Sequence, residues 1–148
     1  MLLNEYETVV IVRPDLDDAE TFEILDGLDG VITEHAGHVL LRDDWGKRKL
    51  AYPIKRHLKG HYFVVNYLAP NDLVIEYERK IRIEDRIIRF LTVKLGDAVD
   101  VPVRLEQAAE VRRVREEEAA ARAAAEAEAL AQAEAAKAAM ESKQHPQA

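Results

Sequence analysis

The side chains that could do chemistry in this sequence are five histidines, the adjacent aspartates Asp43 and Asp44, and a single serine near the C-terminus. Two histidines four residues apart share a metal only on a helix, and Gly60 disfavours a helix between His57 and His61. Asp43 and Asp44 are adjacent, so on a strand they point to opposite faces and do not act as a pair. The sequence has no cysteine and no nucleotide-binding or hydrolase motif. We therefore expect that the protein binds no metal, cofactor or small-molecule substrate and is not an enzyme.

The cations are concentrated in two segments of an otherwise acidic chain. The net charge is −7, and residues 1–41 hold one cation against ten anions. Residues 42–60 hold seven cations against two anions, and residues 79–94 hold six against two. Total charge argues against a nucleic-acid partner, but a polyanion responds to the local field, so these two segments remain candidates for binding.

Contact with RNA phosphates is the functional interpretation of these cations, and a solubilising sheet edge is the alternative. Arginine adds bidentate geometry to such contacts. The segment after Gly60 lacks the aromatic spacing of an RNA-recognition module, so we expect backbone or shape recognition rather than base stacking. The candidate RNA-binding residues are Lys47, Arg48, Lys49, Lys55, Arg56, Lys59, Arg82, Arg86 and Arg89.

Hydrophobic periodicity predicts the elements that must position these residues. Strands are expected at residues 4–12, 38–52, 61–69 and 86–94, and helices at residues 18–36 and about 71–85. This β-α-β-β-α-β order predicts an α+β, ferredoxin-like fold, in which a four-stranded antiparallel sheet carries both helices on one face. We expect residues 1–100 to form this domain.

Several local features mark the ends of these elements. Asp17 and Glu20 have the spacing of a capping box, with Phe22, Leu25, Leu28 and Ile32 following on the inward face. Gly37 is expected to end the first helix in a left-handed conformation. Asn71 is expected to cap the second helix. Pro53 should end regular strand pairing, and a polar loop is expected at residues 55–60.

The sheet face away from the helices should be polar if it meets water, and here it is apolar. The residues expected there, and proposed as a partner-protein interface, are Val9, Ile11, Tyr62, Val64, Leu91 and Val93. An exposed apolar surface of this kind usually marks an interface. A C-terminal segment folded back over the face, or an error in one strand's orientation, would explain it equally well.

The C-terminal residues 101–148 differ in composition, being rich in alanine and glutamate. They predict an extended, solvated helix or a helix–coil mixture, with disorder from Ser142 to Ala148. No segment has the length and hydropathy of a membrane span or a signal peptide, and cysteine is absent. We therefore expect a cytoplasmic protein with no membrane partner.

Three motifs resemble one known family. Residues 46–54, read as Gly-Lys-Arg-Lys-Leu-Ala-Tyr-Pro-Ile and followed by Gly-His-Tyr-Phe at residues 60–63, are similar to the signature of bacterial small-subunit ribosomal protein six. Residues 6–14 and 83–89 also resemble that family, and the similarity spans about residues 3–96.

The resemblance implies a ferredoxin-like, non-enzymatic protein associated with ribosomes. Members of this family bind the central domain of small-subunit ribosomal RNA together with small-subunit ribosomal protein eighteen. RNA would then account for the basic segments, and protein eighteen for the uncovered apolar face. The alternative is a ferredoxin-like regulatory or protein-interaction module that binds no RNA.

Overall fold

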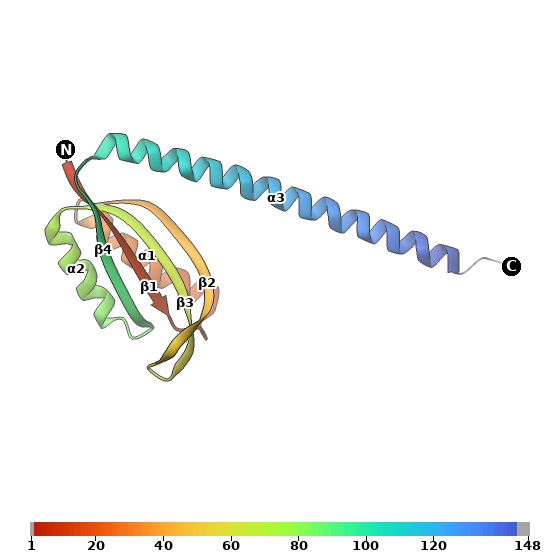
Figure 1. The fold of residues 1–148 in the computed structure, drawn as a ribbon, viewed down its shortest axis with the longest axis horizontal. Coiled ribbons are helices and arrows are strands. Elements are labelled where there is room, and N and C mark those ends of the chain that lie inside the picture. Colours follow the sequence, from red (N-terminus) through yellow and green to blue (C-terminus); the bar gives the residue numbers. More distant parts are fainter. Residues whose placement is uncertain (1, 145–148) are drawn as a thin grey trace. The chain divides into compact units, whose positions relative to one another are not determined.

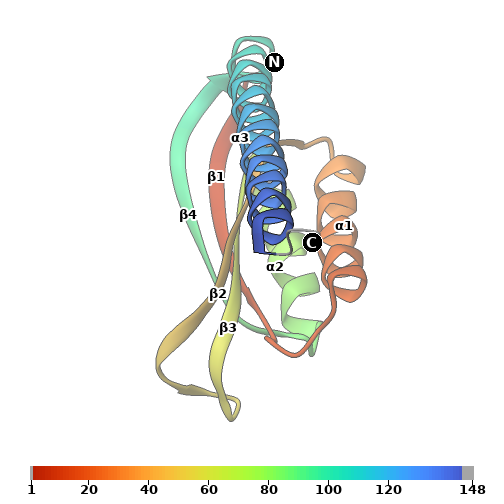
Figure 2. The ribbon, with the colours of Figure 1, turned by 90° about the vertical axis from the view of Figure 1, so that its right-hand side faces the viewer.

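Strand β1 lies inside a four-stranded antiparallel sheet whose strand order is β2-β3-β1-β4. The computed structural model describes residues 2–144. The elements are β1 (Leu2–Val12), α1 (Asp18–Glu34), β2 (His38–Ile54), β3 (His57–Ala69), α2 (Asn71–Ile83), β4 (Ile87–Asp100) and α3 (Val101–Gln144). Helices α1 and α2 lie on the same face of the sheet (Figures 1 and 2). The α+β, ferredoxin-like prediction is confirmed.

The main core lies between this sheet face and the two helices. Alternate residues of the central strands point into it, because successive side chains of a strand face opposite ways. The sheet contributes Val10, Val12, Phe63, Val65 and Tyr67, among others, and the helices contribute Leu25, Leu28, Ile32, Leu73, Tyr77 and Ile81. Of the residues predicted to face inward from α1, Leu25, Leu28 and Ile32 belong to this core, whereas Phe22 is 53% exposed and does not.

A buried hydroxyl network joins three strands within this core. Thr8 of β1 lies between its partners Val65 and Thr92 in the register, and its hydroxyl bonds Tyr67 Oη and Thr92 Oγ1 at 3.0 Å each. Burial raises the pKa of Tyr67 to about 12, because the charged phenolate is poorly solvated there.

Replacing Tyr67 with phenylalanine should lower the free energy of unfolding at pH 7 by about 1 kcal/mol, through loss of one buried hydrogen bond. The difference in stability between wild type and Tyr67→Phe should also change with pH in the alkaline range. Its pKa in the folded state lies above its value in the unfolded chain, so its contribution is intact below pH 10 and declines as pH rises towards 12. Urea unfolding followed by Trp45 fluorescence at pH 7 and pH 11 should show a smaller difference between wild type and Tyr67→Phe at pH 11. An equal difference at both pH values would contradict this.

Helix α1 begins as predicted and ends differently. The side chain of Asp17 accepts from the Glu20 amide, and Glu20 accepts from the Asp17 amide, which completes the capping box. At the other end Ala36, not Gly37, adopts the left-handed conformation, with φ of 61°. Gly37 is required for space, since a Cβ atom there would lie 2.7 to 2.8 Å from Leu73, Ile32 and the Leu68 carbonyl oxygen. Gly37 does follow the end of the helix as predicted, but the predicted reason, a left-handed conformation, was wrong.

Helix α2 lacks the side-chain cap predicted from Asn71. Pro70 occupies the capping position and makes no side-chain cap hydrogen bond. Asn71 is the first residue of the helix, and its Oδ1 accepts instead from Asn4 Nδ2 at 2.7 Å and from Tyr6 Oη at 2.9 Å. The amide side chain thus ties α2 to β1, a tertiary role that local capping rules do not anticipate.

The connection between β2 and β3 is much shorter than the predicted six-residue loop. Ile54 pairs with His57, so only Lys55 and Arg56 form the turn, and their φ values are 47° and 67°. Positive φ at both central residues is the requirement of a type I′ hairpin turn. Pro53 does not end β2, but regular pairing stops near it, because four residues of β2 lie opposite one residue of β3 between Lys49 and Ile54.

Two more irregularities re-aim side chains. In β2, residues 42–44 pair regularly with β3, and the register shifts on either side of them. In β4 the register shifts between the partners of Ile11 and Val12. Ile88 consequently packs with Ile11 and Leu50 on the face away from the helices, although simple alternation along β4 would place it on the same face as Phe90. Strand β4 also continues to Asp100, six residues beyond the predicted end.

The first two turns of α3 belong to the folded unit, which comprises residues 1–108. Val101 and Ala108 are buried with Leu3, Leu40 and Leu68 in a small core on the second face of the sheet. The rest of α3 forms a separate unit that is exposed throughout residues 109–144. The domain boundary expected after residue 100 stays a prediction.

The expectation of disorder at the C-terminus is wrong for residues 142–144, which are helical. Its remaining residues, 145–148, lie outside the described part of the chain. Among residues 2–144 no helix has the length and apolar character needed to cross a bilayer.

Candidate functional site

The basic motif forms the end of the β2–β3 hairpin, which reaches past the other strands (Figure 2). We call residues 46–60 the hairpin arm. Its base is held by Asp44, whose Oδ1 accepts from the Gly46 amide and bonds His61 Nε2, both at 2.7 Å. Gly46 has a φ of 78°, and the register shifts beside it. Asp44 therefore fixes the bend from which the arm starts, rather than taking part in acid–base chemistry.

The cations of the arm are exposed and are not neutralised by carboxylates. None of the six (Lys47, Arg48, Lys49, Lys55, Arg56 and Lys59) forms an ion pair with another residue in the described range 2–144. Arg48 lies over the Trp45 ring at 5.2 Å and donates to the Trp45 carbonyl oxygen. The Trp45 ring thus holds the guanidinium of Arg48 in place at the base of the arm.

Two of these cations face each other directly. Lys49 of β2 is the register partner of Lys59 of β3. Like charges opposite one another in an antiparallel pair destabilise a hairpin, by up to about 1 kcal/mol. A solubilising edge would not need this arrangement, because alternating charges would serve it as well. An anionic ligand would stabilise both ammonium groups, which makes this pair a candidate binding site within the arm.

The turn of the arm is a second unusual feature that suggests a functional role for its side chains. Asparagine and glycine are the residues that suit two successive positive φ values, yet this turn is Lys55-Arg56. Each side chain in that conformation is strained by about 1–2 kcal/mol. Strain of this kind that persists at an exposed tip motivates a functional hypothesis for the side chains that impose it.

The three candidate residues of the second basic segment, Arg82, Arg86 and Arg89, lie in different environments. Arg82 makes an exposed ion pair with Glu78 at 3.3 Å and lies 5.4 Å from the centre of the Phe90 ring. Arg89 donates to Tyr52 Oη at 2.7 Å. Arg82 and Arg89 approach the tip of the arm, where together with Lys55 they line one hollow.

Arg86 is the most heavily paired of the candidates. Its guanidinium donates to both oxygens of Glu84, at 2.8 and 3.0 Å, and Glu23 lies 3.8 Å away. The hydrogen bonds from Arg86 lower the pKa of Glu84, so this carboxylate stays charged. Arg86 is therefore the candidate least free to bind phosphate.

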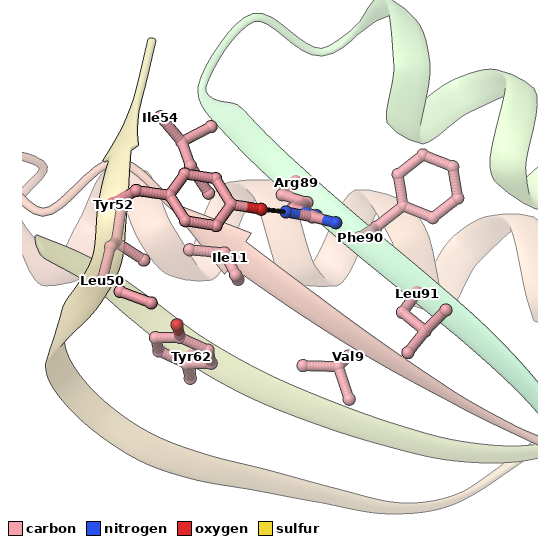
Figure 3. A pocket seen from close by; sticks show the side chains of 10 residues that line it. Val9, Ile11, Leu50, Tyr52, Ile54, Tyr62, Arg89, Phe90 and Leu91 are labelled. Carbon is pink, nitrogen blue, oxygen red and sulfur yellow. Dashed lines mark hydrogen bonds between the residues drawn. The ribbon is translucent and has the colours of Figure 1, made fainter. Parts of the chain in front are cut away.

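A groove of about 360 Å³ opens on the second sheet face beneath the arm. The sheet supplies Val9, Ile11, Tyr62, Arg89, Phe90 and Leu91, and the arm supplies Leu50, Ala51, Tyr52 and Ile54. Figure 3 shows Tyr52 reaching across to Arg89, with Leu50 and Ile54 beside it. The irregular pairing near Pro53 bends this part of the arm over the sheet, which sequence alternation alone could not reveal.

The six residues expected on this face differ widely in exposure. Four of them line the groove, namely Val9, Ile11, Tyr62 and Leu91. Leu91 is 62% and Val93 46% exposed, whereas Ile11 and Val64 are 8% and 5% exposed. Leu95, 50% exposed, lies beyond the predicted end of β4 and was missed for that reason. Only the exposed residues of this set, such as Leu91 and Val93, can bury additional apolar surface against a partner.

The C-terminal segment covers the other end of this face. Val101, Leu105 and Ala108 pack against Leu3 and Leu68 there. The alternative of a folded-back segment therefore holds for one end of the face. Within residues 2–108, no segment covers the end of the face where the groove lies. Among the described residues no group of three histidine, aspartate or glutamate side chains is arranged to hold a metal ion.

Comparison with known proteins gives one consistent result. The model of the family described as ribosomal protein S6 matches residues 5–94. The chain is 40% identical over 110 residues to small ribosomal subunit protein bS6 of Desulfatibacillum aliphaticivorans, which is 74% of this chain and 60% of that protein. It spans less than two thirds of that relative's length. It is 42% identical over 98 residues to the protein of the same name from Nitratidesulfovibrio vulgaris (strain Miyazaki F), covering 66% of this chain and 97% of that one.

A solved structure shares the fold. The crystal structure of 30S ribosomal protein S6 from Thermotoga maritima superposes with a TM-score of 0.60 at 23% identity. The match covers 76% of this chain and 98% of the other.

Proposed function

The chain belongs to the ribosomal protein S6 family, and from this premise we propose that it is a structural component of the small ribosomal subunit. The family is structural and non-enzymatic. Association with the ribosome would place the protein in the cytoplasm. The relatives carry the name of a small-subunit protein, and the exposed, unneutralised cations of the hairpin arm support such a role in an acidic chain.

We propose that the arm contacts the phosphate backbone of the central domain of small-subunit ribosomal RNA. The opposed ammonium groups of Lys49 and Lys59 carry this proposal, because they destabilise the free protein and would be stabilised by phosphate. Lys47, Arg48, Lys55 and Arg56 extend the same surface. Arg82 and Arg89 contribute from the sheet side, and Arg86, paired with Glu84 and Glu23, contributes least.

We propose that the open groove binds small-subunit ribosomal protein eighteen. Leu91 and Val93 are exposed aliphatic residues on an edge strand, where a free protein gains by burying them. Leu50, Tyr52 and Ile54 form the opposite wall, so an inserted side chain would touch both the arm and the sheet. The partner protein and the RNA would then meet the chain on adjoining surfaces.

Purification of the tagged full-length chain at moderate salt tests the proposal. We expect it to sediment with small subunits, and to recover both central-domain RNA and protein eighteen when these are supplied in purified form. RNA affinity of the pair should fall steeply with salt, because binding releases counterions. Recovery of neither partner would overturn the ribosomal role. Recovery of protein without salt-dependent RNA binding would instead favour a protein-interaction module.

A further inference from the structure

A second, basic hollow lies beside the apolar groove and shares Arg89 and Phe90 with it. Its volume is about 290 Å³, and three cations border it: Lys55 from the turn of the arm, Arg82 from α2 and Arg89 from β4. Ile81, Ile87, Ile88 and Phe90 supply its apolar lining. Ile81, Ile87 and Ile88 are buried, so Phe90 is the apolar side chain that the hollow exposes most. Segments that are distant in the sequence thus bring three positive charges around one partly exposed aromatic ring.

We propose that this hollow binds a single unstacked nucleotide of the RNA. The base would lie against Arg82, whose guanidinium already lies over Phe90, and the phosphate would lie between Lys55 and Arg89. Arginine planes and aromatic rings are the surfaces on which proteins stack unpaired bases, and ammonium and guanidinium groups bind the phosphate. The assignment rests on the proposed RNA-binding function and gives it a specific site. It departs from the expectation, drawn from the sequence, of backbone or shape recognition without base stacking.

The local contacts suit this occupant. The ion pair of Arg82 with Glu78 is exposed and 3.3 Å long, so a ligand can displace it at little cost. Arg89 donates through one nitrogen to Tyr52, which holds the guanidinium in place and leaves its other donors available. Lys55 forms no ion pair within residues 2–144 and sits at a strained turn position. A hollow of this size is at the small end of ligand pockets, so it suits one nucleotide.

Chemical specificity separates this proposal from a general attraction of anions. A hollow lined only by cations would take any phosphate, whereas the Arg82 guanidinium plane and the Phe90 ring add affinity for a base. Adenosine 5′-monophosphate should therefore bind more tightly than inorganic phosphate or adenosine alone, because only the nucleotide satisfies both parts. Duplex RNA offers phosphates but no unstacked base, so it should gain only the electrostatic part of this affinity.

The chain provides two matched pairs of variants for the test. Lys55→Asn and Arg56→Asn each remove one cation from the same turn, at similar positive φ values, but only Lys55 borders the hollow. Arg82→Gln and Arg79→Gln each remove an exposed arginine paired with a glutamate on α2, and only Arg82 borders the hollow.

The experiment is an NMR titration of the full-length chain with adenosine 5′-monophosphate, inorganic phosphate and adenosine. We expect the nucleotide to shift the amides of residues 81–90, with affinity about fivefold lower in Lys55→Asn and Arg82→Gln than in their partners. Equal binding of inorganic phosphate would show an anion site only, and equal effects within each pair would show general electrostatics; either overturns the assignment. Ribosomal association is measured separately by sedimentation, so failure here would leave that proposal standing.

Discussion

Replacing Leu91 with lysine is expected to lower the affinity of the chain for protein eighteen by about 100-fold, because it places a charge in an apolar contact. Leu91 is 62% exposed in the free chain, so the fold should tolerate the change. It lines the groove next to Arg89, so the new ammonium meets a like charge and no carboxylate. The added positive charge should not weaken direct contact with RNA.

The matched control is Ile75→Lys, which places the same charge at an aliphatic residue of α2 that is 72% exposed. Calorimetric titration of each variant with purified protein eighteen measures the affinity, and urea unfolding measures stability. We expect Ile75→Lys to bind as wild type does. If Leu91→Lys also binds normally, the groove is not the site of the partner.

Replacing both Lys49 and Lys59 with glutamine should weaken RNA binding while stabilising the free protein. Loss of two phosphate contacts should make the slope of log affinity against log salt shallower by about 0.7 to 0.9 for each contact, and should lower affinity by about tenfold. Removal of the opposed ammonium groups should raise the free energy of unfolding by about 0.2 to 1 kcal/mol.

The control for the lysine pair is Arg79→Gln with Lys94→Gln, which removes the same charge from residues that are already paired with Glu76 and Asp97. We expect it to leave the salt slope almost unchanged and to bring no gain in stability. Filter binding across a salt series and urea unfolding provide the two measurements. A lysine variant that became more stable without losing RNA affinity would indicate that the pair has no ligand.

The order of the elements and the inward faces of most strands could be predicted from sequence, because period-two and helical patterns are local properties of the chain. Val10, Phe63 and Val65 face the helices as their alternation predicts, and Asp17 with Glu20 forms the expected cap. The basic composition of the arm was equally visible. Some errors lie where a tertiary contact overrides the local rule, as for Asn71, which bonds β1 rather than its own helix.

What only the tertiary structure decided is how the candidate residues meet. A register shift in β4 turned Ile88 to the groove face, and irregular pairing before Ile54 folded the arm over the sheet. The pairing register opposed Lys49 to Lys59, and a two-residue turn brought Lys55 towards Arg82 and Arg89. The sequence by itself determined the four strands, two helices and two basic segments. It could not place one basic segment against the other, because register and bulges depend on contacts between residues distant in the chain.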